Sequence, residues 1–422
     1  MLLQRHRWTV LVVLVAINVL AYVDRAMLIA FSPQITAELS LTDTEYGFLT
    51  GMVWVLSFGV MAIFLGSLAD RYSRPRIIAG GVLVWSVCTL ASGMVQDFGQ
   101  MVAARFLVAS GEAALVPAAT AIIAEIFDGR QRGTVNGLFF FGMPLGIGCA
   151  YLVSGTLGVS VGWRHTYLIL GLIGIAIALP IALVPDERSR SHAEDFGEPF
   201  ARQVRTLLAE LAARPVVVLT IAGFVAAHVI FAQVSFLPLW LVRERGAEAA
   251  AVARDIGVLQ IAFGGLGAIL GGFVGDRIAA RLPSGHAAFP VLALAVCVPL
   301  MVMSRYAPFG GVTFNAGLAA GFFLPFSLYA CTIATLQGEL PERLRATAVG
   351  FTMMCNNFIA IAAGTLVAGA VSDHLAHAGH PAPLRAVVLG TDLVAGSAIV
   401  FYLAAALLKR RRAAADAGAL AR

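Results

Sequence analysis

Charged residues are scarce in this sequence of 422 amino acids. Asp, Glu, Lys and Arg together make up 13% of it, about half the share that is usual in a soluble domain. Hydrophobic residues make up 59%, and the mean hydropathy is +0.86. They form runs of roughly 20 to 30 residues, long enough to cross a hydrocarbon core about 30 Å thick. The scarcity of charge excludes an ordinary soluble domain and predicts a chain that crosses a membrane many times.

Short catalytic and metal-binding motifs are missing as well. The sequence contains no GxxxxGK[ST], HExxH or GxSxG, so nucleotide hydrolysis, zinc peptidase and nucleophile-elbow chemistry lack support. We therefore expect no enzymatic activity, no cofactor and no metal; a membrane enzyme or a receptor with a transporter fold is a minor alternative. The five cysteines lie inside apolar runs without CxxC spacing and are predicted to be small core residues: Cys88, Cys149, Cys297, Cys331 and Cys355.

The apolar runs predict an all-α membrane protein with twelve transmembrane helices. An even number of spans places both termini on one side of the membrane. Most of the 29 Lys and Arg residues fall on that side, so the positive-inside rule predicts cytoplasmic termini. The helices are expected near 8–37, 45–69, 76–96, 99–127, 133–158, 163–185, 214–243, 250–276, 286–304, 308–337, 346–372 and 385–408.

A polar stretch near the midpoint divides the chain. It predicts an N-terminal six-helix bundle at 1–185, a cytoplasmic linker at 186–213, a C-terminal six-helix bundle at 214–409 and a cytoplasmic tail at 410–422. The halves repeat each other, because Gly66-Ser-Leu-Ala-Asp70-Arg71 recurs as Gly272-Phe-Val-Gly-Asp276-Arg277 at an equivalent place. The repeat predicts an internal duplication and two pseudo-symmetric halves.

The first copy of the repeat continues as Tyr-Ser-Arg74-Pro-Arg76. As a whole it resembles the signature between helices 2 and 3 of the major facilitator superfamily. The resemblance implies transport by alternating access, in which the loop closes and opens one side of the protein. The residues that it marks for conformational gating are Gly66, Asp70, Arg71 and Arg74, with Asp276 and Arg277 in the second copy.

Two further stretches resemble spinster-type transporters within that superfamily. They are Asn18-Val-Leu-Ala-Tyr22-Val-Asp24-Arg25 and Arg105-Phe-Leu-Val-Ala-Ser-Gly111-Glu112. The resemblance implies a secondary transporter of an amphipathic lipid-like substrate, such as a lysolipid or a sphingoid phosphate. We also expect a monomer in a bacterial inner membrane, with protons and lipid as partners and no nucleic acid. The anion:cation symporter family shares parts of both stretches, so an organic-anion or drug transporter is the alternative.

Four charges lie well inside apolar helices: Asp24, Arg25, Arg105 and Glu112. Each costs about 2.5 to 3.5 kcal/mol at mid-helix, which implies interior positions with partners. We expect Asp24, Glu112 and Arg105 to couple transport to protons, because desolvation and a neighbouring arginine tune the pKa of a buried acid in opposite directions. A permanently paired structural network is the alternative. Arg105 and Glu112 are about 10 Å apart along one helix, so Asp24, water or a substrate headgroup must lie between them.

Substrate contacts are expected on two chemically different walls of a cavity. The first half offers charge and the second half offers aromatic rings, which suits an amphipathic substrate. Aromatic packing between helices or against lipid is the alternative, and His228 is either a proton relay or a hydrogen-bonded packing residue. The predicted substrate-binding residues are Arg25, Arg105, Tyr22, Phe231, Trp240, Phe322, Phe326, Tyr329 and Asn356.

Overall fold

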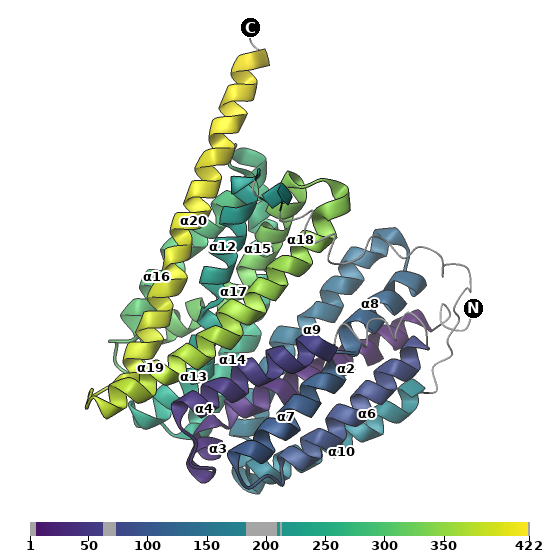
Figure 1. Cartoon of the computed structure of the whole chain (residues 1–422), viewed down its shortest axis with the longest axis vertical. Helices are drawn as coiled ribbons and strands as arrows, with labels where there is room; N and C mark the ends of the chain where they lie inside the picture. The colour runs from purple at the N-terminus through teal and green to yellow at the C-terminus, as the bar shows by residue number, and fades with distance from the viewer. Residues whose placement is uncertain (1–5, 62–72, 183–208, 212, 421–422) are drawn as a thin grey trace. The chain divides into compact units, whose positions relative to one another are not determined.

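The computed structural model describes residues 6–61, 73–182, 209–211 and 213–420. Every regular element in this range is helical, so the predicted all-α class is confirmed (Figure 1). Eleven helices in the described range are long and apolar enough to cross a membrane. The predicted helix near 45–69 is described as far as residue 61 and is helical from Asp43 to that point.

The chain divides into two compact units. Unit 1 holds the described residues up to 182, together with Ser235–Ile261 and Thr365–His380, and unit 2 holds the rest. Within the described residues, the chain therefore passes between the units at 234–235, 261–262, 364–365 and 380–381. The passage at 261–262 lies in the π-helical turn η2 (Gln260–Gly264), and the passage at 364–365 comes directly after the π-helical turn η4 (Asn356–Ala363). Such turns are rare in α-helices and often lie at functional positions.

Unit 1 is built around two long helix pairs. In it α2 packs along α9, and α6 packs along α10. The helices of this unit are α2 (Arg7–Ala30), α3 (Ser32–Glu38), α4 (Asp43–Gly47) with η1 (Phe48–Met52), α6 (Arg74–Ser92), α7 (Phe98–Glu112), α8 (Leu115–Ile126), α9 (Gly129–Gly155), α10 (Leu157–Ala182), most of α13 (Ile230–Arg243), α14 (Ala249–Leu259) and most of α19 (Gly364–His377).

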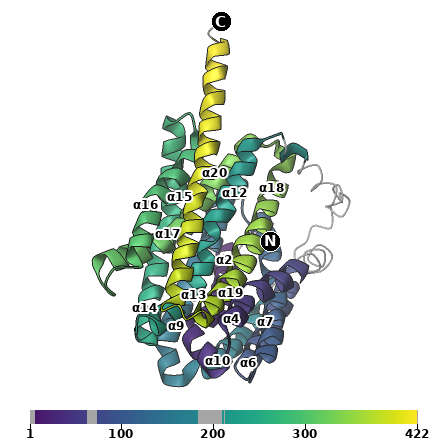
Figure 2. The ribbon, with the colours of Figure 1, turned by 60° about the vertical axis from the view of Figure 1, so that its left-hand side comes forward.

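Unit 2 is centred on α17, which packs against α15 and α16, while α12 packs along α20. Helix α20 continues as a straight rod past its neighbours toward the C-terminus (Figures 1 and 2). The helices of this unit are α12 (Pro215–His228), the start of α13 (Ile230–Arg243), α15 (Gly265–Arg281), η3 (Gly285–Ala287), α16 (Ala288–Ser304), α17 (Val312–Glu339), α18 (Glu342–Cys355) and α20 (Pro383–Leu420).

Several predicted helices are interrupted. The first, expected over 8–37, ends at Ala30 and restarts at Ser32, with Pro33 in the first turn of α3. Proline is tolerated there because the first amides of a helix have no intrahelical acceptor. The helix expected over 99–127 is split into α7 and α8, immediately after Glu112. A charged residue is thus placed at a break inside an apolar segment.

Candidate functional site

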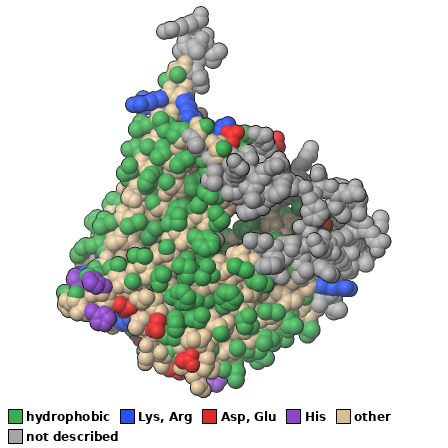
Figure 3. Space-filling view, viewed as in Figure 1, with side chains coloured by type: hydrophobic (Ala, Val, Ile, Leu, Met, Phe, Trp, Pro, Cys, Tyr) green, Lys and Arg blue, Asp and Glu red, His purple; other side chains and the backbone are tan. Residues whose placement is uncertain are grey.

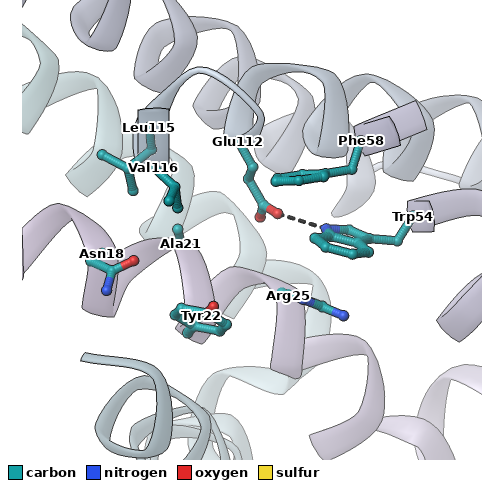
Figure 4. Close-up of a pocket in the computed structure, with 9 residues that line it drawn as sticks. All are labelled: Asn18, Ala21, Tyr22, Arg25, Trp54, Phe58, Glu112, Leu115 and Val116. Carbon is teal, nitrogen blue, oxygen red and sulfur yellow. Dashed lines mark hydrogen bonds between the residues drawn. The ribbon is translucent and has the colours of Figure 1, made fainter. Parts of the chain in front are cut away.

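A small pocket of about 60 Å³ opens inside unit 1. Its walls come from α2, from the helical stretch that follows η1, and from the α7–α8 break (Figure 4). Most of the lining is apolar or aromatic, and the charged groups are one arginine and one glutamate. The lining residues are Asn18, Ala21, Tyr22, Arg25, Trp54, Phe58, Glu112, Leu115 and Val116.

Asp24 and Arg105 form a buried ion pair beside this pocket. Arg105 Nη1 donates to Asp24 Oδ1 at 3.0 Å, and Nη2 donates to the backbone oxygen of the same residue at 3.1 Å. The hydroxyl of Thr89 donates to Asp24 Oδ2. Asp24 and Arg105 are 2% and 6% exposed. Both carboxylate oxygens of Asp24 are therefore occupied, and this acid already has the partners that burial demands.

Glu112 is held differently. Its Oε2 accepts a hydrogen bond of 2.9 Å from the indole Nε1 of Trp54. Its Oε1 has no hydrogen-bond partner among the described residues, although Glu112 is only 6% exposed. Figure 4 shows the carboxylate reaching toward the middle of the pocket. Glu112 is thus a buried acid with one hydrogen bond from protein and one oxygen open to the pocket.

A close helix crossing fixes the position of Glu112. A methyl group added at the preceding residue, Gly111, would lie 2.6 Å from the backbone oxygen of Gly81 in α6. Only glycine permits this approach, so α6 and α7 touch through their backbones at this point. The Glu112 side chain leaves α7 about 100° around the helix from this contact, toward the pocket.

Arg25 and Tyr22 complete the polar wall of the pocket on α2. The guanidinium carbon of Arg25 lies 3.5 Å from the centre of the Trp54 ring, a cation–π contact. Because Arg25 follows Asp24 directly, the two side chains leave α2 about 100° apart. Asp24 reaches Arg105 while Arg25 lines the pocket. The pair of Asp24 and Arg105 therefore lies beside the pocket that Arg25 and Glu112 line.

The predicted aromatic residues of unit 2 form a connected set of rings. Phe231 lies 6.3 Å from Phe326 and 5.6 Å from His228, and His228 lies 5.0 Å from Tyr329, measured between ring centres. Phe322 is buried in the same helix as Phe326. Trp240 falls in unit 1, where its ring lies 5.7 Å from the guanidinium of Arg245.

Polar side chains are also buried in the helices of unit 2. His228 Nδ1 lies 2.7 Å from the backbone oxygen of Phe224, as expected for a hydrogen-bonded packing residue. Asn356 is 1% exposed, and its Oδ1 has no partner among the described residues. Gln233 is 2% exposed, and its Oε1 likewise has no partner among the described residues. This residue was not predicted from the sequence. Unit 2 thus buries neutral amide groups as well as the charged pair Arg305 and Asp392 in its interior.

The predicted gating residues are described only in part. Gly66, Asp70 and Arg71 lie outside the described residues. Arg74 forms an ion pair with Glu125 of α8. In the second copy, Asp276 is bound by His286 Nε2 at 3.0 Å, and the Arg277 guanidinium lies 3.4 Å from the centre of the Phe273 ring.

A polar interlock within unit 1 was not predicted from the sequence. Asp43, at the start of α4, accepts from Arg243 at 2.7 Å and from Ser372 at 2.6 Å. Asp373 accepts from the backbone amides of Asp43 and Thr44 at 3.0 and 2.8 Å, which satisfies the free amides at the start of the helix. The interlock joins α4 to the ends of α13 and α19. Its members come from three distant parts of the sequence, which explains why no local pattern marked them.

A family model described as the Major Facilitator Superfamily matches residues 14–365. The chain belongs to the major facilitator superfamily. A relative from Mycolicibacterium smegmatis named MFS-type efflux pump is 29% identical over 96% of this chain and 94% of its own. Protein spinster of Drosophila melanogaster is 29% identical over 94% of this chain and 67% of its own. The relative named sphingosine-1-phosphate transporter in Xenopus tropicalis is 26% identical over 84% of this chain and 72% of its own.

A solved structure supports the same fold. A bacterial homologue of the human lysosomal transporter Spinster, in an inward-facing and unoccupied conformation, matches with a TM-score of 0.78 at 23% identity and covers 97% of both chains. The predicted major facilitator fold and the resemblance to spinster proteins are confirmed. The protein is a multi-pass membrane transporter and not an enzyme, as predicted. The roles of individual residues stay predictions.

Proposed function

We propose that this protein moves an amphipathic, lipid-like substrate by alternating access and that transport is linked to protons. The observation that supports this proposal most directly is the state of Glu112. Its open oxygen lies in a pocket with Arg25 on one side and apolar side chains on the other. A buried carboxylate that lacks a full set of partners is a functional candidate by default in a membrane protein.

Glu112 is the first candidate for the protonated group, and Asp24 is the second. Asp24 is compensated by Arg105 and Thr89, so its charge is satisfied within unit 1. Among the described residues Glu112 has a single N–H donor, Trp54, so the stability of its charge depends on what fills the pocket. A change of access that exchanges water for substrate at this position changes the free energy of the charged form. Proton binding and access are then linked reciprocally.

The chemistry of the residues in each unit, taken separately, supports this substrate class. Arg25 offers a cation for an anionic headgroup, and Glu112 offers a hydrogen-bonding group beside it. The rings around Phe231 and Phe326 offer apolar surface for a tail. The name of the Xenopus tropicalis relative, sphingosine-1-phosphate transporter, agrees with a lysolipid or sphingoid phosphate. An organic-anion or drug transporter is the second candidate, and the efflux pump from Mycolicibacterium smegmatis favours it.

The test is uptake into proteoliposomes of a lysolipid panel and a panel of organic anions, each with and without a pH gradient. We expect lysolipid flux that responds to the gradient. In Glu112→Gln the flux should lose most of its pH dependence, because glutamine stays neutral at every pH. Asp255→Asn is the matched control, since it neutralises an exposed acid of α14 outside the pocket.

Two results separate the candidates. Flux of organic anions without flux of lysolipids would reject the lipid-like substrate and favour the second candidate. Wild-type rate and pH dependence in both Glu112→Gln and Asp24→Asn would reject proton linkage through these acids, with His228 the next residue to test.

We further propose that both termini are cytoplasmic in a bacterial inner membrane and that residues 186–213 link two six-helix halves. The excess of arginine on that side supports this orientation. Cysteines introduced at the C-terminus should react with an impermeant reagent only after the cells are broken. Labelling in intact spheroplasts would reverse the proposed orientation.

A further inference from the structure

Helix α20 carries four consecutive basic residues, Lys409 to Arg412, at the point where its apolar segment ends. The helix does not stop there but continues to Leu420. Figure 3 shows Lys and Arg side chains gathered at the base of this protruding end, next to the hydrophobic surface of the helices below. The four residues lie on a rigid helix, so their directions follow from helical geometry.

Two of the four basic residues form ion pairs with an acidic residue of the protein. Lys409 Nζ lies 3.0 Å from Glu339 Oε1, and Arg412 Nη1 lies 3.3 Å from Glu339 Oε2. Lys409 and Arg412 are three residues apart and therefore share one face of the helix. This face continues the buried residues Tyr402 and Ala405, which pack inside unit 2. Lys409 and Arg412 thus fasten α20 to the end of α17.

The other two basic residues continue a different face. Leu403 and Leu407 are 45% and 47% exposed, and they form part of an exposed apolar stripe along the membrane segment. Arg410 and Arg411 follow Leu407 by three and four residues, so they extend this stripe. Both are exposed, and no ion pair joins either of them to an acidic residue in the part of the chain that the structure describes.

An exposed apolar stripe of a membrane helix meets lipid tails, and the groups at its end meet lipid headgroups. We infer that Arg410 and Arg411 form a binding site for the phosphate of an anionic phospholipid on the membrane face where the C-terminus lies. The planar guanidinium donates two parallel hydrogen bonds to a phosphate, which an ammonium cannot do. The ion pairs that Lys409 and Arg412 form with Glu339 keep α20 from rotating about its axis. Arg410 and Arg411 therefore stay directed toward the headgroups.

The ligand is a lipid of the surrounding bilayer and not the transported substrate. The site lies on the outside of α20 in unit 2, whereas the candidate transport pocket lies in unit 1. The inference therefore does not depend on the cargo or on proton linkage. It predicts that phosphatidylglycerol binds the transporter more tightly than phosphatidylcholine does, because only the first carries net negative charge.

The test uses the purified full-length protein, stripped of lipid in detergent and titrated with phosphatidylglycerol or phosphatidylcholine. Bound lipid is counted by native mass spectrometry, and the unfolding temperature is followed in parallel. The double substitution Arg410→Gln with Arg411→Gln should weaken phosphatidylglycerol binding about 25-fold, from roughly fivefold for each charge near a membrane surface. Phosphatidylcholine binding should stay unchanged.

Three further arms make the test decisive. Arg410→Lys with Arg411→Lys keeps the charge and should recover part of the loss. Arg254→Gln with Arg385→Gln removes two charges elsewhere and should leave lipid binding unchanged. Inorganic phosphate should not compete, because the site combines the arginines with the lipid-covered stripe. The inference is overturned by unchanged phosphatidylglycerol binding in the double glutamine variant, by an equal loss in the control pair, or by competition from free phosphate.

Discussion

Arg243 and Asp43 are 200 residues apart in the sequence, and their side chains are joined by an ion pair of 2.7 Å. The contact brings the end of α13 into unit 1, beside the start of α4. Asp43 also accepts from Ser372, so the same carboxylate holds α19. The interlock therefore ties together three segments of unit 1 that are far apart in the sequence.

Breaking either side of this ion pair should destabilise unit 1. The Asp43 side chain is 10% exposed and that of Arg243 is 38% exposed, so the pair is partly shielded from water. In a double-mutant cycle of Asp43→Asn and Arg243→Gln, we expect a coupling energy of about 1 kcal/mol or more. Unfolding in mixed detergent gives the four free energies of the cycle. Additive effects of the two substitutions would mean that the contact contributes nothing.

The close approach of α19 to α4 provides a second test of the interlock. A methyl group at Gly369 would lie 2.1 Å from the backbone oxygen of Asp43. Gly369→Ala must therefore push the two elements apart, and the unfolding temperature should fall by several degrees. Gly390→Ala in α20 is the control, because nothing lies within 4 Å of the added methyl group. That substitution should be neutral or slightly stabilising, since alanine favours helix by about 1 kcal/mol.

Most of the helices could be predicted from hydropathy alone, because a chain segment that crosses lipid must be both apolar and helical. The helix expected over 163–185, for example, corresponds to the part of α10 that follows a break at Gly162, where φ is +77°. The breaks at Phe31 and after Glu112 were not predictable in the same way. The break after Glu112 lies inside a predicted membrane segment, and hydropathy carries no information on where a backbone bends. The break at Phe31 precedes Ser32 and Pro33, and a proline in the first helical turn is a signal that hydropathy alone does not use. The passage of α13 between the two units is equally invisible to a pattern of apolar residues.

The charged residues of the candidate site could be predicted from the sequence, because a charge inside an apolar helix is energetically unfavourable. Asp24, Arg105 and Glu112 stood out because a charge in an apolar helix needs a partner. The structure supplies partners that the sequence could not identify, namely Thr89 for Asp24 and Trp54 for Glu112. A neutral donor has no sequence signature of its own. Which neutral donor lies next to a buried acid depends on the rotation of each helix about its axis.

Arg305 and Asp392 test the cost of an unpaired charge inside unit 2. Both are 0% exposed, and Arg305 donates to both carboxylate oxygens at 2.7 and 3.2 Å. Arg305→Met leaves the carboxylate of Asp392 buried without its cation, which should cost about 3 to 5 kcal/mol. The double variant Arg305→Met with Asp392→Leu should recover most of this stability, because neither charge is left. Equal damage from the single and double variants would contradict the account.

Glu38 provides a pH test outside the membrane-spanning segments. Hydrogen bonds from Arg164 at 2.8 Å and from Trp163 at 2.6 Å hold the pKa of this carboxyl below its usual value. A pKa that is lower in the folded state contributes stability above the unfolded value of about 4.3, and this contribution is lost as the pH falls through the folded value.

Glu38 is exposed, so the contribution should be less than about 1 kcal/mol. The unfolding temperatures of the wild type and Glu38→Gln should therefore differ at pH 7 and converge below about pH 4, the unfolded range of a carboxyl. A difference that stays constant down to acidic pH would assign the effect to packing instead of charge.

The rings of unit 2 should set the preference for substrate chain length. Each methylene that leaves water for an apolar surface contributes about 0.8 kcal/mol, or roughly a factor of four in affinity. Phe326 is 7% exposed and contacts Phe231, so replacing both with serine removes apolar surface without adding charge.

In competition uptake with lysolipids of increasing chain length, the wild type should gain affinity with each methylene. The serine variant should show a shallower slope and bind the shortest chain almost as well as the wild type does. Phe309→Ser is the control, because this ring is 46% exposed and contacts Phe314 instead. An equal loss at every chain length would mean that Phe231 and Phe326 stabilise the fold and do not contact the tail.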